Sequence, residues 1–249
     1  MGLFDIFKKN KSAGVSKPPS ADKAVMRLAK VATDKHAQNY DRLEAIQSLG
    51  SIATAESAVA LLRRFTFYIE PSITDQEEKE TAFQGVLAVG ENAIVPIRDF
   101  CLRAESLTWP MKLLEALLDD DGYVDELLAL LSRFDTEYTK NVEPKLQIIS
   151  ALQGTKRDDV REAVEPFLQD VNEPVRFHAV STIFALQNPD AAEALCRALV
   201  DEESLRVKIR TSEGLLAREW PVPEALHKDV AGSLPPAFRL EGSLVKKTR

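Results

Sequence analysis

The fold is decided by the stretch from Asn172 to Trp220, which reads NEPVRFHAVSTIFALQNPDAAEALCRALVDEESLRVKIRTSEGLLAREW. Polar breaks at 187–190 and 201–204 divide it into three segments of about three helical turns each. Pro174 suits a first helical position, because its φ is already helical and its missing N–H would have no partner there. The apolar residues of the first segment recur at helical spacing and share one face: Val175, Ala179, Ile183 and Leu186. The stretch therefore predicts three consecutive helices joined by turns.

The second of these helices carries small apolar residues, so a neighbouring helix can approach it closely. A helix pair of this size cannot bury its apolar faces alone and needs copies of itself on either side. The sequence offers such copies, because the first helix of each expected pair ends in a leucine: Leu49, Leu87, Leu117, Leu152, Leu186 and Leu216. Their steps of 38, 30, 35, 34 and 30 residues fall in the range of helical-pair repeats. We therefore expect an all-α fold, an α-solenoid of about five to six helical hairpins.

The opening of the fifth pair carries a family resemblance. Glu173-Pro174-Val175-Arg176, followed by Ala179 and Leu186, resembles the opening of a HEAT repeat, particularly the short type of phycobilisome-lyase-like HEAT proteins. Similar openings occur at 159–163 and 204–206. The resemblance covers roughly residues 36–220 and is clearest from Asp158 onward, since the earlier repeats lack the Pro-Val-Arg opening. It implies an architecture used for many functions, mostly protein binding.

Composition divides the chain into three parts and restricts its partners. Residues 1–20 read as an N-terminal segment with a short amphipathic stretch, 21–240 as the solenoid and 241–249 as a C-terminal tail. Residues 1–40 carry a net charge of +5 and the remainder −12. An acidic body argues against nucleic acid, because phosphate contacts need a basic face. No long apolar run and no signal peptide are visible, so we expect a cytoplasmic protein.

The longest step between the leucines places an insertion at 63–73, which reads RRFTFYIEPSI. Insertions in solenoids tend to lie on one face, often the binding face. Aromatic residues beside arginines are also the types enriched at interface hot spots. The candidate partner-binding residues are therefore Arg63, Arg64, Phe65, Phe67 and Tyr68. The alternative is that the apolar residues of the insertion cover the end of the first helical pair.

Residues 1–11 read MGLFDIFKKNK and offer a second candidate for surface contact. Four apolar residues can share one side of a short helix followed by lysines: Leu3, Phe4, Ile6 and Phe7. Such a segment can anchor to a membrane surface or enter a partner's groove. Membrane contact is not favoured, because four apolar residues bind a bilayer weakly. The alternative is an end that frays or folds back on the body.

Motifs that carry chemistry are missing from the sequence. None of the three histidines is followed by Glu, no Cys or His spacing suits zinc, and no phosphate-binding Gly-rich loop is present. The acidic turn at 119–122 would place leucines at the first and last ligand positions of a calcium loop. The cysteines, Cys101 and Cys196, lie in apolar helical contexts and are expected to be buried, reduced thiols. We therefore predict no catalytic residue, no metal and no cofactor.

These observations lead to one functional hypothesis and two alternatives. The favoured hypothesis is a non-enzymatic protein–protein interaction module, a scaffold, adaptor or regulatory subunit, that binds a protein partner on the solenoid surface. The family resemblance implies the first alternative, a bilin lyase or isomerase. The amphipathic N-terminal segment suggests the second, a peripheral membrane adaptor.

Overall fold

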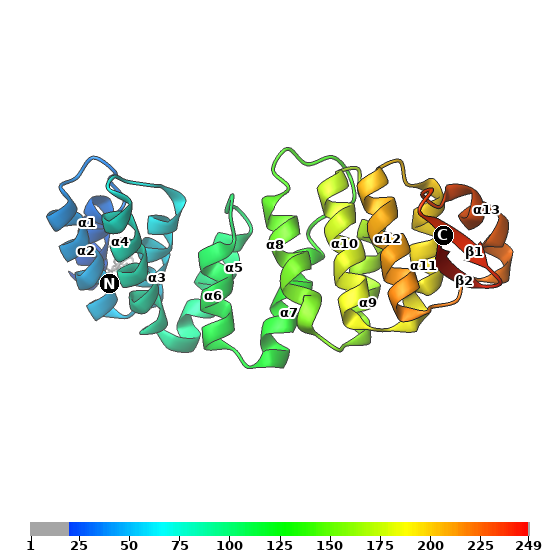
Figure 1. The fold of residues 1–249 in the computed structure, drawn as a ribbon. Helices are drawn as coiled ribbons and strands as arrows, with labels where there is room; N and C mark the ends of the chain where they lie inside the picture. The colour runs from blue at the N-terminus through cyan, green and yellow to red at the C-terminus, as the bar shows by residue number, and fades with distance from the viewer. Residues whose placement is uncertain (1–19, 249) are drawn as a thin grey trace, which may run out of the picture.

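The structure, a computed structural model, describes residues 20–248 as a row of helices with a two-stranded sheet at one end (Figure 1). A single helix, α1 (Ser20–Ala32), precedes six helical hairpins. The first helices of the hairpins are α2 (Asn39–Ile52), α4 (Ser72–Leu87), α6 (Thr108–Leu117), α8 (Glu143–Ala151), α10 (Glu173–Leu186) and α12 (Leu205–Arg218). The second helices are α3 (Ala55–Leu62), α5 (Ile94–Cys101), α7 (Asp120–Leu131), α9 (Asp158–Val164), α11 (Ala192–Asp201) and α13 (His227–Ser233).

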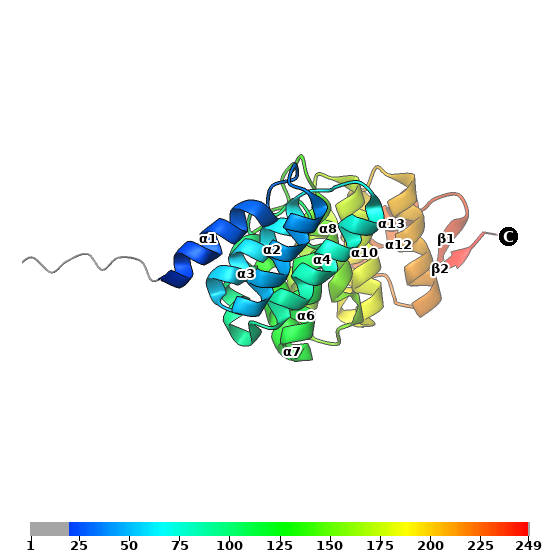
Figure 2. The same ribbon diagram turned by 90° about the vertical axis from the view of Figure 1, so that its left-hand side faces the viewer.

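The hairpins stand side by side, so that like helices pack on like helices. Along one face α2 contacts α4, α4 contacts α6, α8 contacts α10, and α10 contacts α12. Along the other face α3 contacts α5 and α7 contacts α9. Figure 2 looks along the row and separates α3 from the side occupied by α4, α8 and α10. The chain is therefore an α-solenoid, and its all-α, HEAT-like prediction is confirmed.

Local signals explain where the hairpins begin and end. Pro174 occupies the first turn of α10, as expected. Ser204 caps α12 by accepting a hydrogen bond from the Val207 N–H, and Asp119 caps α7 in the same way from Gly122. Each of the six periodic leucines falls in the last turns of a first helix or directly after it. These leucines belong to or pack on one continuous apolar core that runs the length of the described chain.

The C-terminal end differs from the expected tail. Strand β1 (Phe238–Glu241) pairs antiparallel with β2 (Leu244–Lys247), and the turn between them places Gly242 at a φ of +59°. Phe238 and Val245 are buried, while β2 contacts α12 and β1 contacts α13. The hairpin covers the last apolar edge of the solenoid, which explains why alternating residues that looked like a tail become ordered strands.

Two sequence predictions concern membranes. Within residues 20–248, no helix combines the length and apolar character needed to cross a bilayer. The possible anchor residues Leu3, Phe4, Ile6 and Phe7 lie outside the described residues.

Candidate functional site

The insertion at 63–73 forms a 3-10 turn, η1 (Arg63–Thr66), and an extended link that ends where α4 begins at Ser72. It does not present its arginines and aromatic residues as one patch. Arg63 is exposed, Arg64 is buried, Phe65 is half-buried, and Phe67 and Tyr68 lie in the link. The five predicted residues are therefore spread over three environments.

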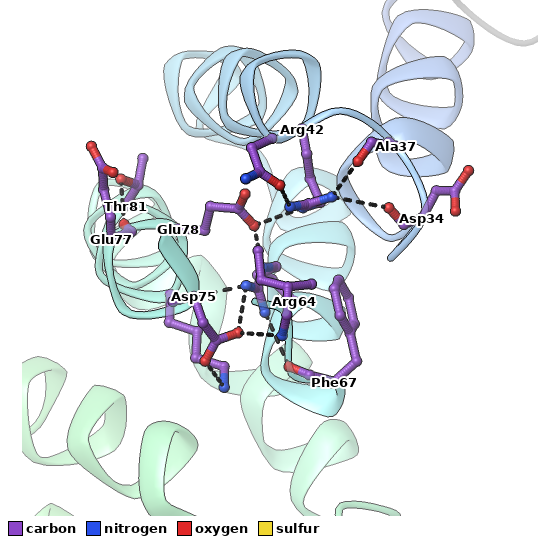
Figure 3. A network of polar contacts seen from close by, with 12 residues as sticks. Asp34, Ala37, Arg42, Arg64, Phe67, Asp75, Glu77, Glu78 and Thr81 are labelled. Atoms are coloured by element: carbon purple, nitrogen blue, oxygen red, sulfur yellow. Dashed lines mark hydrogen bonds and ion pairs between the residues drawn. The ribbon is translucent and has the colours of Figure 1, made fainter. Parts of the chain in front are cut away.

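Arg64 lies in a buried ionic cluster between α2, η1 and α4 (Figure 3). Its Nη2 donates to Asp75 Oδ1 at 2.7 Å and its Nε to Glu78 Oε2 at 2.7 Å. Arg42 Nε donates to the same Glu78 oxygen at 2.8 Å, so one carboxylate oxygen binds two guanidinium groups. The side chains of Arg42, Arg64 and Glu78 are at most 1% exposed. Arg64 thus has no surface to offer a partner, and its role is to hold the first two hairpins together.

The surroundings of Asp75 favour its ionised form. Burial by itself raises the pKa of Asp75, but hydrogen bonds from Lys79 and Arg64 oppose it and lower the pKa below its usual value. Lys79 Nζ lies 2.7 Å from Asp75 Oδ2. An ionised Asp75 is the partner that the buried Arg64 guanidinium requires.

Phe67 and Tyr68 lie beside the cluster. The Arg64 guanidinium sits 4.5 Å from the centre of the Phe67 ring, and Lys79 lies 5.8 Å from that of Tyr68. Tyr68 is 54% exposed and Phe67 is half-buried. Phe67 thus helps to cover the ionic cluster, which agrees with the alternative that the insertion covers the first helical pair.

Arg63 and Phe65 instead line an open groove between α3 with η1 on one side and α5 on the other. Its volume is about 880 Å³. We call it the α3–α5 groove; it is lined by Ala55, Val59, Leu62, Arg63, Phe65, Thr66, Asn92, Val95, Pro96, Asp99, Phe100, Arg103, Ala104, Glu105 and Ser106. Val59 is 45% exposed and Val95 is 58% exposed, so both walls present apolar side chains to solvent. Such a concave apolar surface with a few charges at its rim is the usual form of a binding site.

Aromatic packing fixes one side of the groove. The Phe65 ring stacks on Trp109 of α6, with ring centres 5.1 Å apart and planes within 8° of parallel. Phe83 of α4 packs on the same indole, and Lys112 lies 5.1 Å from its ring centre. Phe65 therefore packs on α6 with one face and lines the groove with the other. Offset-stacked rings of this kind are a stable arrangement.

Comparison with known proteins gives one family match. Residues 124–215 match the model of HEAT repeats. Residues 124–215 of this chain contain HEAT repeats. The matched stretch begins in α7 and ends in α12, the part where the Pro-Val-Arg opening is clearest. The match confirms the HEAT resemblance and does not distinguish the phycobilisome-lyase-like type.

Two further comparisons add no functional information. No curated protein matches the chain. One solved chain, from the computational design of self-assembling cyclic protein homooligomers, is similar at 16% identity over 86% of this chain and 81% of that chain. Its TM-score of 0.15 is too low to support any argument about shape or assembly.

The matched HEAT repeats show a regular form of the ionic contact seen at Arg64. Lys145 of α8 donates to the Asp135 carbonyl in the preceding loop and to Asp170 in the following one, both at 2.7 Å. Arg176 of α10 likewise donates to the Asp170 carbonyl and to Glu202, both at 2.8 Å. In both α8 and α10, a cation near the start of the helix thus ties the loop before it to the loop after it.

One pair of side chains in the HEAT repeats has the geometry of a nucleophile and a base. Ser150 Oγ lies 2.8 Å from His178 Nδ1. Burial, together with nearby Arg206, lowers the pKa of His178, so the imidazole is neutral at pH 7. Within residues 20–248 no carboxylate is hydrogen-bonded to this ring, and the pair lies on α8 and α10, away from the α3–α5 groove. The arrangement therefore lacks the third group that orients the base in acyl-transfer sites.

The remaining candidate chemistry is equally limited. Among the described residues no group of His, Cys, Asp and Glu is placed to hold a metal ion. Cys101 and Cys196 are buried and unpaired, and burial raises the pKa of each thiol to about 12. Protonated thiols of this kind are poor nucleophiles.

Sequence reasoning missed the second wall of the groove. Val95, Asp99 and Arg103 lie on α5 and the loop after it, where the sequence shows no insertion. A signal was present, because Val95 falls outside the stripe of Ile97 and Cys101 that α5 buries. An apolar residue on the polar side of an amphipathic helix indicates a contact beyond the helix's own core.

Proposed function

We propose that the chain is a non-enzymatic interaction module that binds an apolar segment of a protein partner in the α3–α5 groove. The observation that carries the proposal is the groove itself, with Val59 and Val95 facing solvent from opposite walls. HEAT repeats generally serve as protein-interaction modules, which supports the proposal at the level of the fold.

The shape and chemistry of the groove favour a helical segment as its ligand. A groove between two packed helices can accept a third helix, whose residues at i, i+3, i+4 and i+7 supply the apolar anchors. The rim carries Arg63 and Arg103 together with Asp99 and Glu105. Mixed charges at a rim fix the direction and register of a bound segment more than they add affinity.

The same charges support the exclusion of nucleic acid. Two arginines opposed by two carboxylates do not form the basic face that phosphate binding needs, and the whole chain carries a net charge of −7. Two buried, unpaired thiols also fit a reducing compartment, so we place this function in the cytoplasm.

The proposal is tested by paired substitutions in the full chain. Val59→Asp with Val95→Asp places two charges in the groove without touching the buried core. Val171→Asp with Leu205→Asp is the matched control, since these residues are also exposed and apolar but lie outside the groove. Each variant is used to capture partners from cells that express the chain, and a recovered partner is purified and titrated against all three proteins.

We expect the groove variant to weaken partner binding by roughly tenfold or more and the control to bind as the unsubstituted chain does. Circular dichroism and thermal unfolding establish that both variants fold. A partner that binds the groove variant with unchanged affinity would show that the groove is not the binding site.

A further inference from the structure

The chain itself contains a segment whose sequence is complementary to the α3–α5 groove. We infer that residues 3–9 bind in this groove of the same molecule and compete with the protein partner. The inference rests on the proposed function of the groove and adds its regulation. Three independent features support it: apolar complementarity, reach and charge.

The groove and the N-terminal segment have matching apolar surfaces. Val59, Val95 and the half-buried Phe65 form walls that no described side chain covers. The segment supplies four large apolar residues at the spacing of one helical face: Leu3, Phe4, Ile6 and Phe7. A short amphipathic helix laid in an apolar groove buries both surfaces at once.

The connection between segment and groove is long enough. Residues 10–19 join the segment to α1, and a chain of ten residues spans about 17 Å as a random coil and about 35 Å at full extension. Helix α1 packs against α3, as Figure 2 also shows, and the next neighbour of α3 is α5. Only α3 therefore separates α1 from the groove, and packed helices lie about 8–10 Å apart, a separation that an extended connector can span.

Charge favours the same placement. The segment and its connector carry four lysines, Lys8, Lys9, Lys11 and Lys17, against one acidic residue, Asp5. The elements that form the groove expose four carboxylates, at Glu56, Glu91, Asp99 and Glu105. They expose three arginines, of which Arg98 is paired with Glu126 of α7. The charges that line the groove are balanced, but the elements around it carry more free carboxylates than free cations, which attracts a basic segment.

The test compares the full chain with its Phe4→Ser, Phe7→Ser variant, which removes two of the proposed anchors and leaves residues 20–248 unchanged. The probe is a fluorescent peptide of residues 1–12, and its binding is followed by anisotropy. A tethered segment acts at an effective concentration in the millimolar range, so the unsubstituted groove should be occupied. We expect the peptide to bind the variant roughly tenfold or more tightly than it binds the unsubstituted chain.

A second measurement locates the segment. Hydrogen exchange of the backbone amides in 55–66 and 94–106 should be slower in the unsubstituted chain than in the Phe4→Ser, Phe7→Ser variant. Adding Val59→Asp and Val95→Asp to that variant should abolish peptide binding, whereas adding Val171→Asp and Leu205→Asp should leave it unchanged.

Several results would overturn the inference. Equal affinity of the peptide for both chains, or no binding to either, removes the intramolecular contact. A dimer that dissociates on dilution and is lost in the Phe4→Ser, Phe7→Ser variant assigns the groove to a second copy instead. Peptide that binds anionic vesicles but neither chain assigns the segment to a membrane. In each case the proposed function still stands if partner binding depends on Val59 and Val95, so the two failures are distinguishable.

Discussion

Two parts of the solenoid connect their hairpins by the same ionic principle in different ways. In the matched HEAT repeats, α8 and α10 each carry one cation near their start, and that cation bridges the flanking loops. Between the first two hairpins, Arg42 keeps this pattern, but its carboxylate comes from within α4 and is shared with Arg64 from the insertion. Arg64 of the insertion thus adds a second buried charge to this contact, while Arg63 and Phe65 line the α3–α5 groove.

The comparison shows how strongly a buried arginine depends on its carboxylate partners. In the HEAT repeats the Lys145–Asp170 pair is also fully buried, but Arg176 keeps 18% of its side chain exposed beside Glu202, so loss of Glu202 would leave a charge that water can reach. Arg42 and Arg64 have no such access, and one Glu78 oxygen serves both. Buried ion pairs are fragile in this sense, since removing one partner leaves the other charge desolvated. Four experiments test the comparison.

The largest effect is expected for Glu78→Gln. This change keeps the shape of the side chain but leaves two buried guanidinium groups with Asp75 as their remaining carboxylate, and it should lower the free energy of unfolding by about 3–5 kcal/mol. Glu202→Gln is the matched change in the HEAT repeats and should cost less, because Arg176 can be hydrated. Urea unfolding of both variants measures the difference, and equal losses would refute the contrast.

The second test concerns close helix approach, which both regions achieve with glycine. A Cβ at Gly214 of α12 would lie 2.1 Å from the buried Phe184 ring, and one at Gly85 of α4 would lie 3.0 Å from the Gly50 backbone. Gly214→Ala should therefore destabilise the fold by about 1–3 kcal/mol. Gly232→Ala is the control, because no atom lies within 4 Å of its added Cβ and alanine favours helix. Thermal unfolding should shift in opposite directions for the two variants.

The third test is the pH dependence of stability, which should have the same sign in both regions. Burial raises the pKa of Glu202, but hydrogen bonds from Arg176 and the Ser204 N–H outweigh it and lower the pKa, as Lys79 and Arg64 do for Asp75. The unfolded chain therefore binds more protons in acid. Stability from these groups is complete above about pH 5 and is lost as the pH falls through the folded-state values.

Urea unfolding between pH 3 and 7 checks this expectation. Glu202→Gln and Asp75→Asn should each flatten the decline of unfolding free energy below about pH 5, because each removes one titrating group. A decline as steep as that of the unsubstituted chain in both variants would show that other carboxylates control acid unfolding.

The smallest effect is expected at the surface of the HEAT repeats. Arg197 and Glu193 form an i,i+4 pair on α11, and both side chains are more than half exposed. Arg197→Ala should change the unfolding free energy by less than about 0.5 kcal/mol, and added salt should reduce even that difference. A loss comparable to that of Glu78→Gln would contradict the view that burial decides the cost.

The sequence predicts the hairpins well because helix periodicity and capping are local. The six leucines, Pro174 and the break at Ser204 all mark boundaries that the structure keeps. Which residues of the insertion are exposed is harder to predict from sequence, since Arg63 and Arg64 are adjacent, yet Arg63 is exposed and Arg64 is buried. The partner of Arg64 lies fourteen residues away in α4, and no local pattern reports that contact. Val95 can be recognised as a surface residue of the groove only when it is known which residues of α5 are buried.

The β1–β2 hairpin has a consequence for engineering the row. Because it places strands over the last apolar edge, a helical pair fused after Lys247 would meet backbone and not a complementary helix face. Lengthening this molecule would instead require new pairs spliced between α11 and α12, where a pair of consensus sequence would find matching neighbours in front and behind.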